Sequence, residues 1–311
     1  MNPILKSHLA LFTVNLLYGA NYVMAKGLMP TIIGPNGFIL LRVGGATLLF
    51  WLIFSIKFEK VVLKDLGLLA ICAIFGVAVN QLLFFNGLMR TSPVNASVIM
   101  TTTPIIVFIL SLIILKEKPK LLKIIGLIIG ATGSIIFTLQ GSSIEGSSIT
   151  GDIFILLNAT SYSLYLVLVK PLMAKYKPLT VITWVFTFGL IYVLLWPMST
   201  AEVSETAFTT FDSSIILTIL FVVIGVTFLP YLLTVYAMKK LSPAVSSTYI
   251  YLQPLLAAMF IYLYWLLGLD DYTQDFTLGK IMAALLVFVG VYLVIKPSKP
   301  KENFTKEPTK G

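Results

Sequence analysis

The 311-residue sequence has few charged residues, one cysteine and one histidine, and each shortage argues against a class of protein. Charged residues make up 11% of the chain and hydrophobic residues 58%, whereas soluble domains carry roughly 25% charged residues. A soluble protein of this composition could not cover its surface, so the excess apolar surface is expected to face lipid. A lone Cys72 excludes a disulfide scaffold, and a lone His8 argues against a histidine-ligated metal site.

Long apolar runs make up most of the chain. A membrane-spanning helix needs about 20 mostly apolar residues, and the sequence contains ten runs of this kind. Their approximate spans are Leu9–Ala25, Gly37–Ile56, Leu66–Leu88, Pro93–Leu115, Leu121–Leu139, Ile153–Met173, Leu179–Met198, Ile215–Met238, Pro243–Leu267 and Leu278–Ile295. The sequence therefore predicts an all-α membrane protein with ten transmembrane helices.

The positive charge of the chain, a net +9, lies mainly on one side of these predicted spans. The loops of one side hold 18 Lys and Arg residues and those of the other side hold three, while Arg42 lies inside a span. The side richer in Lys and Arg faces the cytoplasm, so both termini are expected there, with the protein in the cell inner (plasma) membrane. This arrangement argues against nucleic acid as a partner. The polar residues 297–311 are expected to form a disordered cytoplasmic tail.

The second half of the chain repeats the pattern of the first half. Ser92-Pro93 matches Ser242-Pro243, and Pro104 matches Pro254, both 150 positions apart. A chance match is the alternative, but equal spacing of a Ser-Pro pair and a later proline argues against it. Residues 1–140 and 141–296 are therefore predicted to form two repeats of five helices. Because five is odd, the second repeat enters the membrane from the opposite side, and such inverted repeats are typical of secondary transporters.

Several motifs follow one another in an order that is itself informative. They are Leu41-Arg42 followed by Gly44, Gly45 and Ala46; Asn86–Pro104; Lys116-Glu117-Lys118 before Leu122–Gly133; Gly151-Asp152 leading to Tyr162 and Lys170; and Ser242–Pro254. With these motifs, the sequence resembles the EamA-type transporters of the drug/metabolite transporter superfamily over Ser7–Ile295. The resemblance implies ten helices, a central cavity lined by helices 1, 3, 4, 6, 8 and 9, and export or exchange of small metabolites, often amino acids.

Polar and aromatic residues inside these spans are the candidates for solute binding, because a polar group in a bilayer is costly unless it faces protein or water. The predicted substrate-binding residues are Tyr18, Asn21, Tyr22, Asn80, Gln81, Phe84, Thr102, Tyr162, Tyr165, Tyr231, Tyr249 and Gln253. Aromatic rings and a few amides suit an amphipathic solute. For any single residue, the alternative is that it only ties neighbouring helices together.

Three prolines and one arginine inside the spans are expected to have roles other than solute binding. Pro104 and Pro254 each remove a backbone hydrogen bond and are predicted to bend their helices as hinges, with Pro230 as a third kink; the alternative is a static bend. Arg42, the one charge buried in the membrane, is expected to serve the structure, although it could also attract an anionic group. Glycines such as Gly126, Gly130 and Gly133 permit close helix packing or a weak dimer.

These features together predict a secondary transporter that moves a small amphipathic, amino-acid-like metabolite by alternating access, in export or exchange. A channel or a non-transporting receptor is the alternative. No catalytic residues, cofactor or metal site are predicted, and an enzyme is disfavoured because no nucleophile–base pair lies within the spans. No Asp or Glu occupies the centre of a span, so coupling through a buried carboxylate is not expected. The expected partners are a small-molecule substrate and the lipid bilayer, with the chain a monomer or weak homodimer.

Overall fold

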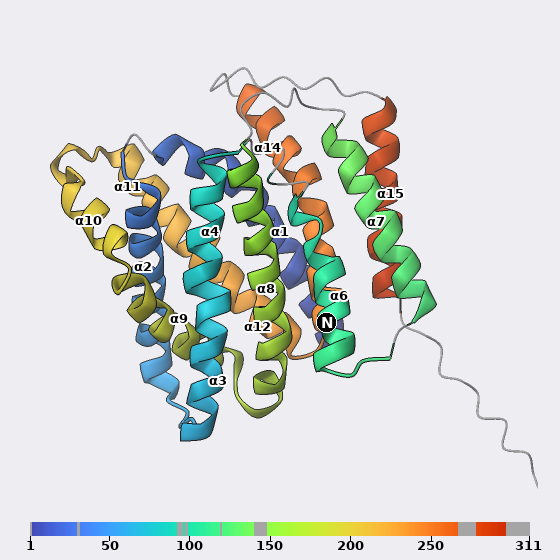
Figure 1. Cartoon of the computed structure of the whole chain (residues 1–311), viewed down its shortest axis with the longest axis horizontal. Helices are drawn as coiled ribbons and strands as arrows, with labels where there is room; N and C mark the ends of the chain where they lie inside the picture. Colours follow the sequence, from blue (N-terminus) through green and yellow to red (C-terminus); the bar gives the residue numbers. More distant parts are fainter. Residues whose placement is uncertain are drawn as a thin grey trace, which may run out of the picture.

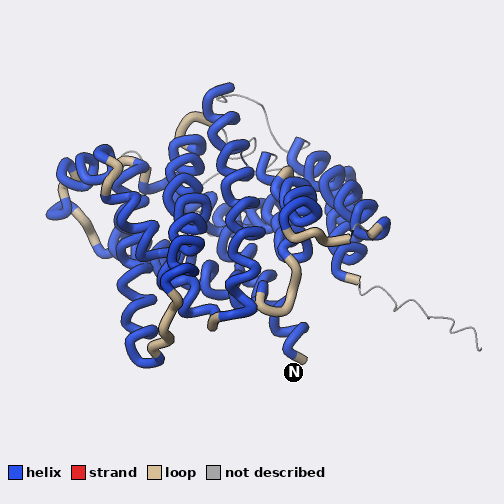
Figure 2. Tube along the Cα trace, turned by 60° about the horizontal axis from the view of Figure 1, so that its bottom comes forward, coloured by secondary structure: helices blue, strands red, loops and turns tan. Residues whose placement is uncertain are grey.

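A computed structural model describes residues 2–29, 32–91, 96, 99–118, 120–139, 148–266 and 278–296. Within these ranges only the backbone is described for residues 22–28, 57, 137–139, 210, 257, 258, 261, 264, 265 and 280. All regular elements in the described ranges are helical and pack as a bundle (Figures 1 and 2). The predicted all-helical class is therefore confirmed.

The helices follow the predicted apolar runs closely. The first half contains α1 Pro3–Leu28, α2 Pro35–Phe54, α3 Leu63–Ala73, the π-helical η2 Ile74–Ala78, α4 Val79–Leu88, α6 Thr103–Ile114 and α7 Leu121–Leu139. The second half contains α8 Ile149–Lys175, α9 Pro178–Leu194, α10 Pro197–Glu205, α11 Ser213–Phe221, the π-helical η4 Val222–Phe228, α12 Leu229–Met238, α13 Pro243–Thr248, the 3₁₀ segment η5 Tyr249–Leu252, α14 Gln253–Leu266 and α15 Leu278–Ile295. Short 3₁₀ turns, η1 Ser55–Lys57 and η3 Phe208–Thr210, occur in two connections.

Capping residues explain why some helices begin at other residues than hydropathy predicts. Helix α1 begins six residues before the predicted Leu9, because the Asn2 side chain accepts a hydrogen bond from the backbone N–H of Ile4 and Pro3 suits a first helical turn. The Asp212 carboxylate caps α11 in the same way, accepting from the N–H of Ile215 at 2.8 Å. Hydropathy locates the apolar part of a helix, whereas the capping residue determines its start.

The predicted span Leu179–Met198 was wrong at its end. Helix α9 stops at Leu194, and α10 follows at a bend of 76°. The bend lies at Trp196, whose backbone is extended because the next residue, Pro197, disfavours a helical conformation before it. Helix α10 then packs on the N-terminus of α2, where the Glu202 carboxylate accepts a hydrogen bond from the N–H of Gly37 at 2.8 Å.

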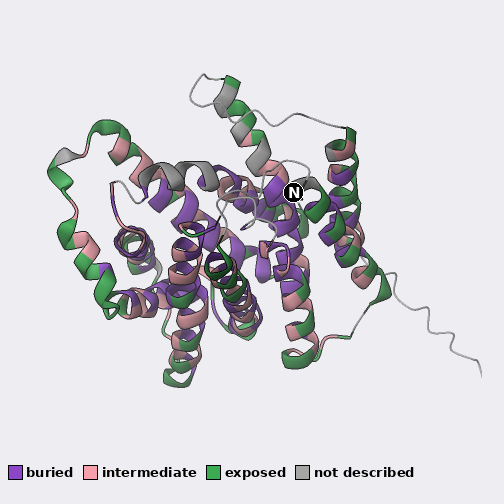
Figure 3. Ribbon diagram, turned by 45° about the horizontal axis from the view of Figure 1, so that its top comes forward, coloured by how far each residue is buried: buried purple, intermediate pink, exposed green. Residues whose placement is uncertain are grey.

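Four helical stretches in the described residues are long and apolar enough to cross a membrane individually: α2, α3–α4, α8 and α11–α12. Their outward faces carry exposed apolar side chains, such as Leu217 at 65% exposure. Figure 3 shows that buried residues gather on the inner faces of the central helices. Apolar exposure of this extent is unfavourable in water, so these faces suit lipid.

Irregular segments recur at matching positions in the two halves. The π-helical segments η2 and η4 end at Ala78 and Phe228, 150 positions apart. Helices α6 and α14 begin at Thr103 and Gln253, also 150 positions apart, each directly after an interruption of the helix. The helix is thus broken just before Pro104 and just before Pro254, where the sequence predicts a bend.

Helices α7 and α15 pack against each other at one edge of the bundle (Figure 1). A Cβ atom placed on Gly290 would lie 2.4 Å from the backbone nitrogen of Gly130, and one on Gly126 would lie 2.8 Å from the carbonyl oxygen of Gly290. These glycines therefore allow the two helices to pack backbone to backbone within the chain. Figure 1 also shows the start of α1 and the end of α15 at the same end of the bundle.

Candidate solute-binding cavity

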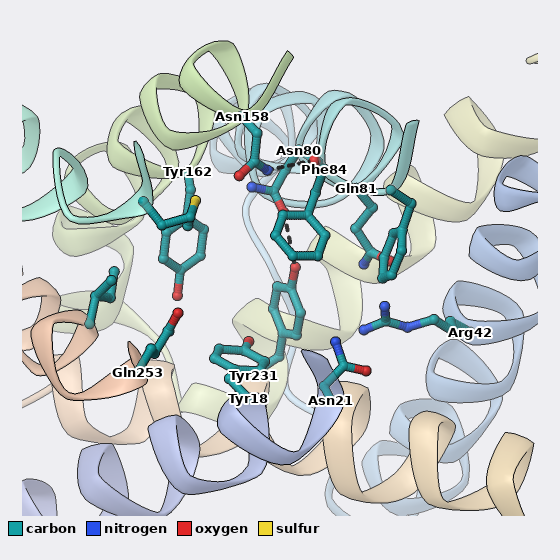
Figure 4. Close-up of a pocket in the computed structure, with 13 residues that line it drawn as sticks. Tyr18, Asn21, Arg42, Asn80, Gln81, Phe84, Asn158, Tyr162, Tyr231 and Gln253 are labelled. Carbon is teal, nitrogen blue, oxygen red and sulfur yellow. Dashed lines mark hydrogen bonds between the residues drawn. The ribbon is translucent and has the colours of Figure 1, made fainter. Parts of the chain in front are cut away.

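A cavity of about 80 Å³, measured as the space open to the centre of a water molecule, lies between helices of both halves (Figure 4). Its walls come from α1, α2, α4, α8, α12, η5, α14 and the segment before α6. The lining residues are Tyr18, Asn21, Arg42, Asn80, Gln81, Phe84, Phe85, Met100, Asn158, Tyr162, Tyr231, Ile250 and Gln253. Neither Asp nor Glu is among them.

Most of the predicted binding residues come together in this lining. They are Tyr18, Asn21, Asn80, Gln81, Phe84, Tyr162, Tyr231 and Gln253. The prediction omitted Phe85, Met100, Asn158 and Ile250. Asn158 lies one helical turn before Tyr162, so the i, i+4 spacing could have placed it on the same face. The other three are apolar, and nothing in their pattern separates them from ordinary core residues.

Three predicted residues lie outside this lining, and for Tyr22 only the backbone is described. Tyr165 is fully buried, with its ring against Gly76. The hydroxyl of Tyr249 is 2.8 Å from Nδ1 of His8, and the Thr102 hydroxyl donates to the carbonyl oxygen of Ile99 at 2.7 Å. Estimated depth in the membrane does not say which way a side chain faces, and the π and 3₁₀ segments change the angular spacing that a regular helix would give.

Several lining residues join helices through hydrogen bonds. Asn158 on α8 donates through Nδ2 to the carbonyl oxygen of Asn80 at 2.7 Å. The Tyr231 hydroxyl on α12 donates at 3.0 Å to the carbonyl oxygen of Gly76, which lies in the π-helical segment η2. Gln253 donates through Nε2 to Oδ1 of Asn15 at 2.9 Å. The same side chains thus connect neighbouring helices and line the cavity.

Other polar atoms of the lining have no hydrogen-bond partner within the described part of the chain. They are Oδ1 of Asn21, Nη1 of Arg42, Nε2 and Oε1 of Gln81, and Oδ1 of Asn158. Leaving a buried polar group unpaired costs about 1–3 kcal/mol. Water or a polar solute in the cavity would remove this cost.

Arg42 lies on the α2 side of the cavity and is only 4% exposed. Its Nε donates to the hydroxyl oxygen of Thr227 in η4 at 3.0 Å. Its guanidinium carbon lies 4.6 Å from the ring centre of Phe85 and 5.6 Å from that of Phe38. Arg42 therefore links α2 to η4 in the second half of the chain, and it also lines the cavity.

A smaller cavity of about 20 Å³ lies toward the N-terminal end of α1. Its lining includes Leu11, Asn15 and Ser246, and it shares Tyr18, Tyr162 and Ile250 with the larger cavity. The two tyrosines and this isoleucine therefore stand where the two cavities meet.

Several known proteins are similar to this chain in sequence or in fold. An uncharacterised transporter of Archaeoglobus fulgidus is 27% identical over 264 residues, which cover 85% of this chain and 90% of that protein. The protein named "Probable terminal-alkyne amino-acid exporter" of Streptantibioticus cattleyicolor is 26% identical over 65% of this chain and 66% of its own length. A crystal structure with 16% sequence identity shares the fold, with a TM-score of 0.71 and coverage of 93% of this chain and 96% of its own.

The family comparison extends over both halves. The sequence model of the EamA-like transporter family matches residues 5–139 and again residues 149–296. Together with the apolar helices, this match identifies an integral membrane protein. The matched segments cover nearly the whole chain, which therefore belongs to the EamA-like transporter family.

Proposed function

We propose that the chain is a secondary transporter that moves a small amphipathic, amino-acid-like metabolite across the cell inner membrane, in export or exchange. The observation that carries this proposal is the cavity of aromatic rings and unpaired amide atoms between the two halves. Its predicted binding set is Tyr18, Asn21, Asn80, Gln81, Phe84, Tyr162, Tyr231 and Gln253, to which Asn158 is added.

The proposed architecture is ten spans in two inverted repeats, residues 1–140 and 141–296, with both termini in the cytoplasm. The two separate family matches support two repeats. So do the helix interruptions that recur 150 positions apart. The shared position of the start of α1 and the end of α15 (Figure 1) supports an even number of crossings.

The proposed solute class follows from the chemistry of the lining. Rings such as Phe84, Tyr162 and Tyr231 can cover an apolar body, whereas the amides of Gln81 and Asn158 can orient polar groups. The name of the Streptantibioticus relative points to the same class of solute.

Alternating access needs a barrier that opens on one side at a time. We propose that Tyr18 and Tyr162, which border both cavities, form the barrier on the side of the chain termini. The interrupted helices at Pro104 and Pro254, and the π-helical segment before Pro230, are the proposed hinges because their broken hydrogen-bond ladders resist bending least.

Counterflow in proteoliposomes tests this function. Vesicles are loaded with one unlabelled amino acid, leucine or phenylalanine, and uptake of the labelled compound is followed. A transporter gives saturable uptake that overshoots equilibrium and falls at least about tenfold in Tyr162→Ala. The matched control is Leu217→Ala, on an outward apolar face.

Three results would contradict the proposal in different ways. Uptake that does not saturate indicates a channel, and binding without uptake indicates a receptor. Equal uptake by the wild type and the Tyr162 variant means that the solute does not use this cavity.

A further inference from the structure

Arg42 is a buried cation without a carboxylate partner in the described part of the chain. The one ion pair found there joins Lys175 to Asp65. The lining of the cavity has neither Asp nor Glu. Transfer of an unpaired charge from water into a protein interior is costly, so a charge kept in this position calls for a partner that the described residues do not supply.

The contacts of Arg42 hold its guanidinium group in one orientation. The Thr227 hydroxyl donates to the carbonyl oxygen of Val222 at 2.8 Å, and its oxygen accepts from Nε of Arg42 at 3.0 Å. The rings of Phe85 and Phe38 lie against the guanidinium group. These contacts use Nε and the flat face of the group, and they leave Nη1 without a partner.

The unpaired side of Arg42 faces the cavity. In Figure 4 its guanidinium group points inward, between Gln81 on one side and Asn21 on the other. Gln81 is 3% exposed, and neither atom of its amide has a hydrogen-bond partner within the described residues. Arg42 and Gln81 can therefore both donate hydrogen bonds to one anionic group at this end of the cavity.

We propose that Arg42 binds the carboxylate of the transported solute, so that the protein selects solutes with a free carboxylate. This inference rests on the proposed function, because it takes the cavity to be the solute site. A carboxylate matches the planar donor pair of an arginine. With Arg42 the single cation in the lining, one carboxylate suits the site better than a doubly charged phosphate.

A second polar group of the lining can accept a hydrogen bond from the solute. Asn158 donates its Nδ2 to the carbonyl oxygen of Asn80, so its Oδ1 is the atom that remains to accept. A solute amino group could donate a hydrogen bond to this oxygen. Because Oδ1 is neutral, the amino group adds affinity but is not required, whereas the carboxylate is required.

Two matched series of compounds test this inference. The first is leucine, leucinamide, 3-methylbutylamine and 4-methylpentanoate; the second is phenylalanine, phenylalaninamide, phenethylamine and 3-phenylpropionate. Binding is measured by ligand-dependent thermal stabilisation of the purified protein, and transport by counterflow. The compounds with a carboxylate should bind, and those without it should bind at least about thirtyfold more weakly.

Variants of Arg42 distinguish a loss of carboxylate binding from a loss of folding. Arg42→Gln should weaken carboxylate binding at least about thirtyfold, and Arg42→Lys should weaken it less, because the charge stays but the planar donor pair is lost. The matched control is Arg90→Gln, which removes the only other arginine of the chain, an exposed one. If Arg42→Gln does not fold, Arg42→Lys and Thr227→Val provide the test, since both should lower the affinity for the acid relative to its amide.

Three results would overturn the inference. The first is equal binding of an acid and its amide, and the second is an affinity of Arg42→Gln for the carboxylates within threefold of the wild-type affinity. The third is that none of the carboxylates binds. Transport of amines or amides without a preference for the acid would leave the transporter proposal intact and refute only the role of Arg42. Carboxylate binding that depends on Arg42 but comes with no counterflow would instead refute transport and leave the binding site intact.

Discussion

At the scale of single residues, some amides and phenols of the cavity both hold a neighbouring helix and line the cavity. Asn158 and Tyr231 each use one polar atom to hold a neighbouring helix. Asn158 keeps a second atom unpaired in the cavity. A side chain that is fixed by one hydrogen bond presents its other atom in a defined place, which lowers the entropy lost when a solute binds.

Asn158→Leu tests this combination. The substitution removes the hydrogen bond to the carbonyl oxygen of Asn80, so the free energy of unfolding should fall by about 0.5–1.5 kcal/mol. Counterflow should also weaken. Thermal unfolding in detergent measures the first effect. The control is Thr160→Ala on the same helix, whose hydroxyl only donates back to Leu156, at 3.0 Å; a loss as large in the control would argue against the tie.

At the scale of elements, the stretches that line the cavity include interrupted helices beside the continuous α1, α2 and α8. The stretches α3–α4 and α11–α12 contain π-helical segments, and α13–α14 contains a 3₁₀ segment. By contrast, α7 and α15 are continuous and pack closely at their glycines. Under the proposed mechanism, the interrupted helices would move, and the closely packed α7 and α15 would support them.

Pro104→Ala and Pro254→Ala test the hinges. Each variant restores a backbone N–H and removes a ring that clashes with the preceding turn, so the interrupted helix can become continuous. The rate of counterflow should fall about tenfold, equivalent to a barrier raised by about 1.4 kcal/mol, without a loss of thermal stability. Pro178→Ala is the control, since Pro178 lies in the first turn of α9, where a missing N–H costs nothing. An unchanged rate in both variants would mean that the bends are static.

Gly290→Ala tests whether the close packing of α7 against α15 stabilises the protein. The added methyl group would meet backbone atoms of Gly130 at 2.4 to 2.5 Å, and backbone cannot move aside as a flexible side chain can. The two helices must separate, so the free energy of unfolding should fall by about 1–3 kcal/mol. Gly67→Ala is the control, because nothing lies within 4 Å of its added Cβ. A destabilisation of similar size in both variants would show that close packing is not the cause.

At the scale of the whole molecule, the proposed inverted repeat places cavity walls from both halves around one solute. Tyr18, Arg42 and Gln81 come from the first half, and Tyr162 and Gln253 from the second. A relative motion of the halves would then change the two ends of the cavity in opposite senses, as alternating access requires.

The proposed orientation in the membrane can be measured directly with single cysteines in a Cys72→Ser background. A cysteine introduced by Ser204→Cys, on the exposed surface of α10, should react with a membrane-impermeant maleimide on intact cells. A cysteine introduced by Lys118→Cys, in the connection before α7, should react only after the cells are permeabilised, since the side rich in Lys faces the cytoplasm. The reverse pattern would refute cytoplasmic termini.

The local properties of the sequence determined the helical class, the apolar stretches and much of the cavity lining. Hydrophobicity identifies helices such as α7 and α15 almost to the residue, because each helix satisfies its own backbone hydrogen bonds. The polar residues within the stretches pointed to the cavity, because a bilayer tolerates them only against protein or water.

Only the tertiary structure decided which of those residues face one another. Tyr165, Tyr249 and Thr102 were predicted to bind the solute, but they lie outside the cavity lining. Tyr249 is part of the 3₁₀ segment η5 and Thr102 directly precedes α6, whereas the ring of Tyr165, on the continuous α8, packs against Gly76. The contact of Arg42 with Thr227 joins residues 185 positions apart, and that of Asn158 with Asn80 joins residues 78 apart. Such contacts depend on how each helix is rotated against its neighbours, and that rotation is determined by packing over the whole bundle rather than by the residues within any one span.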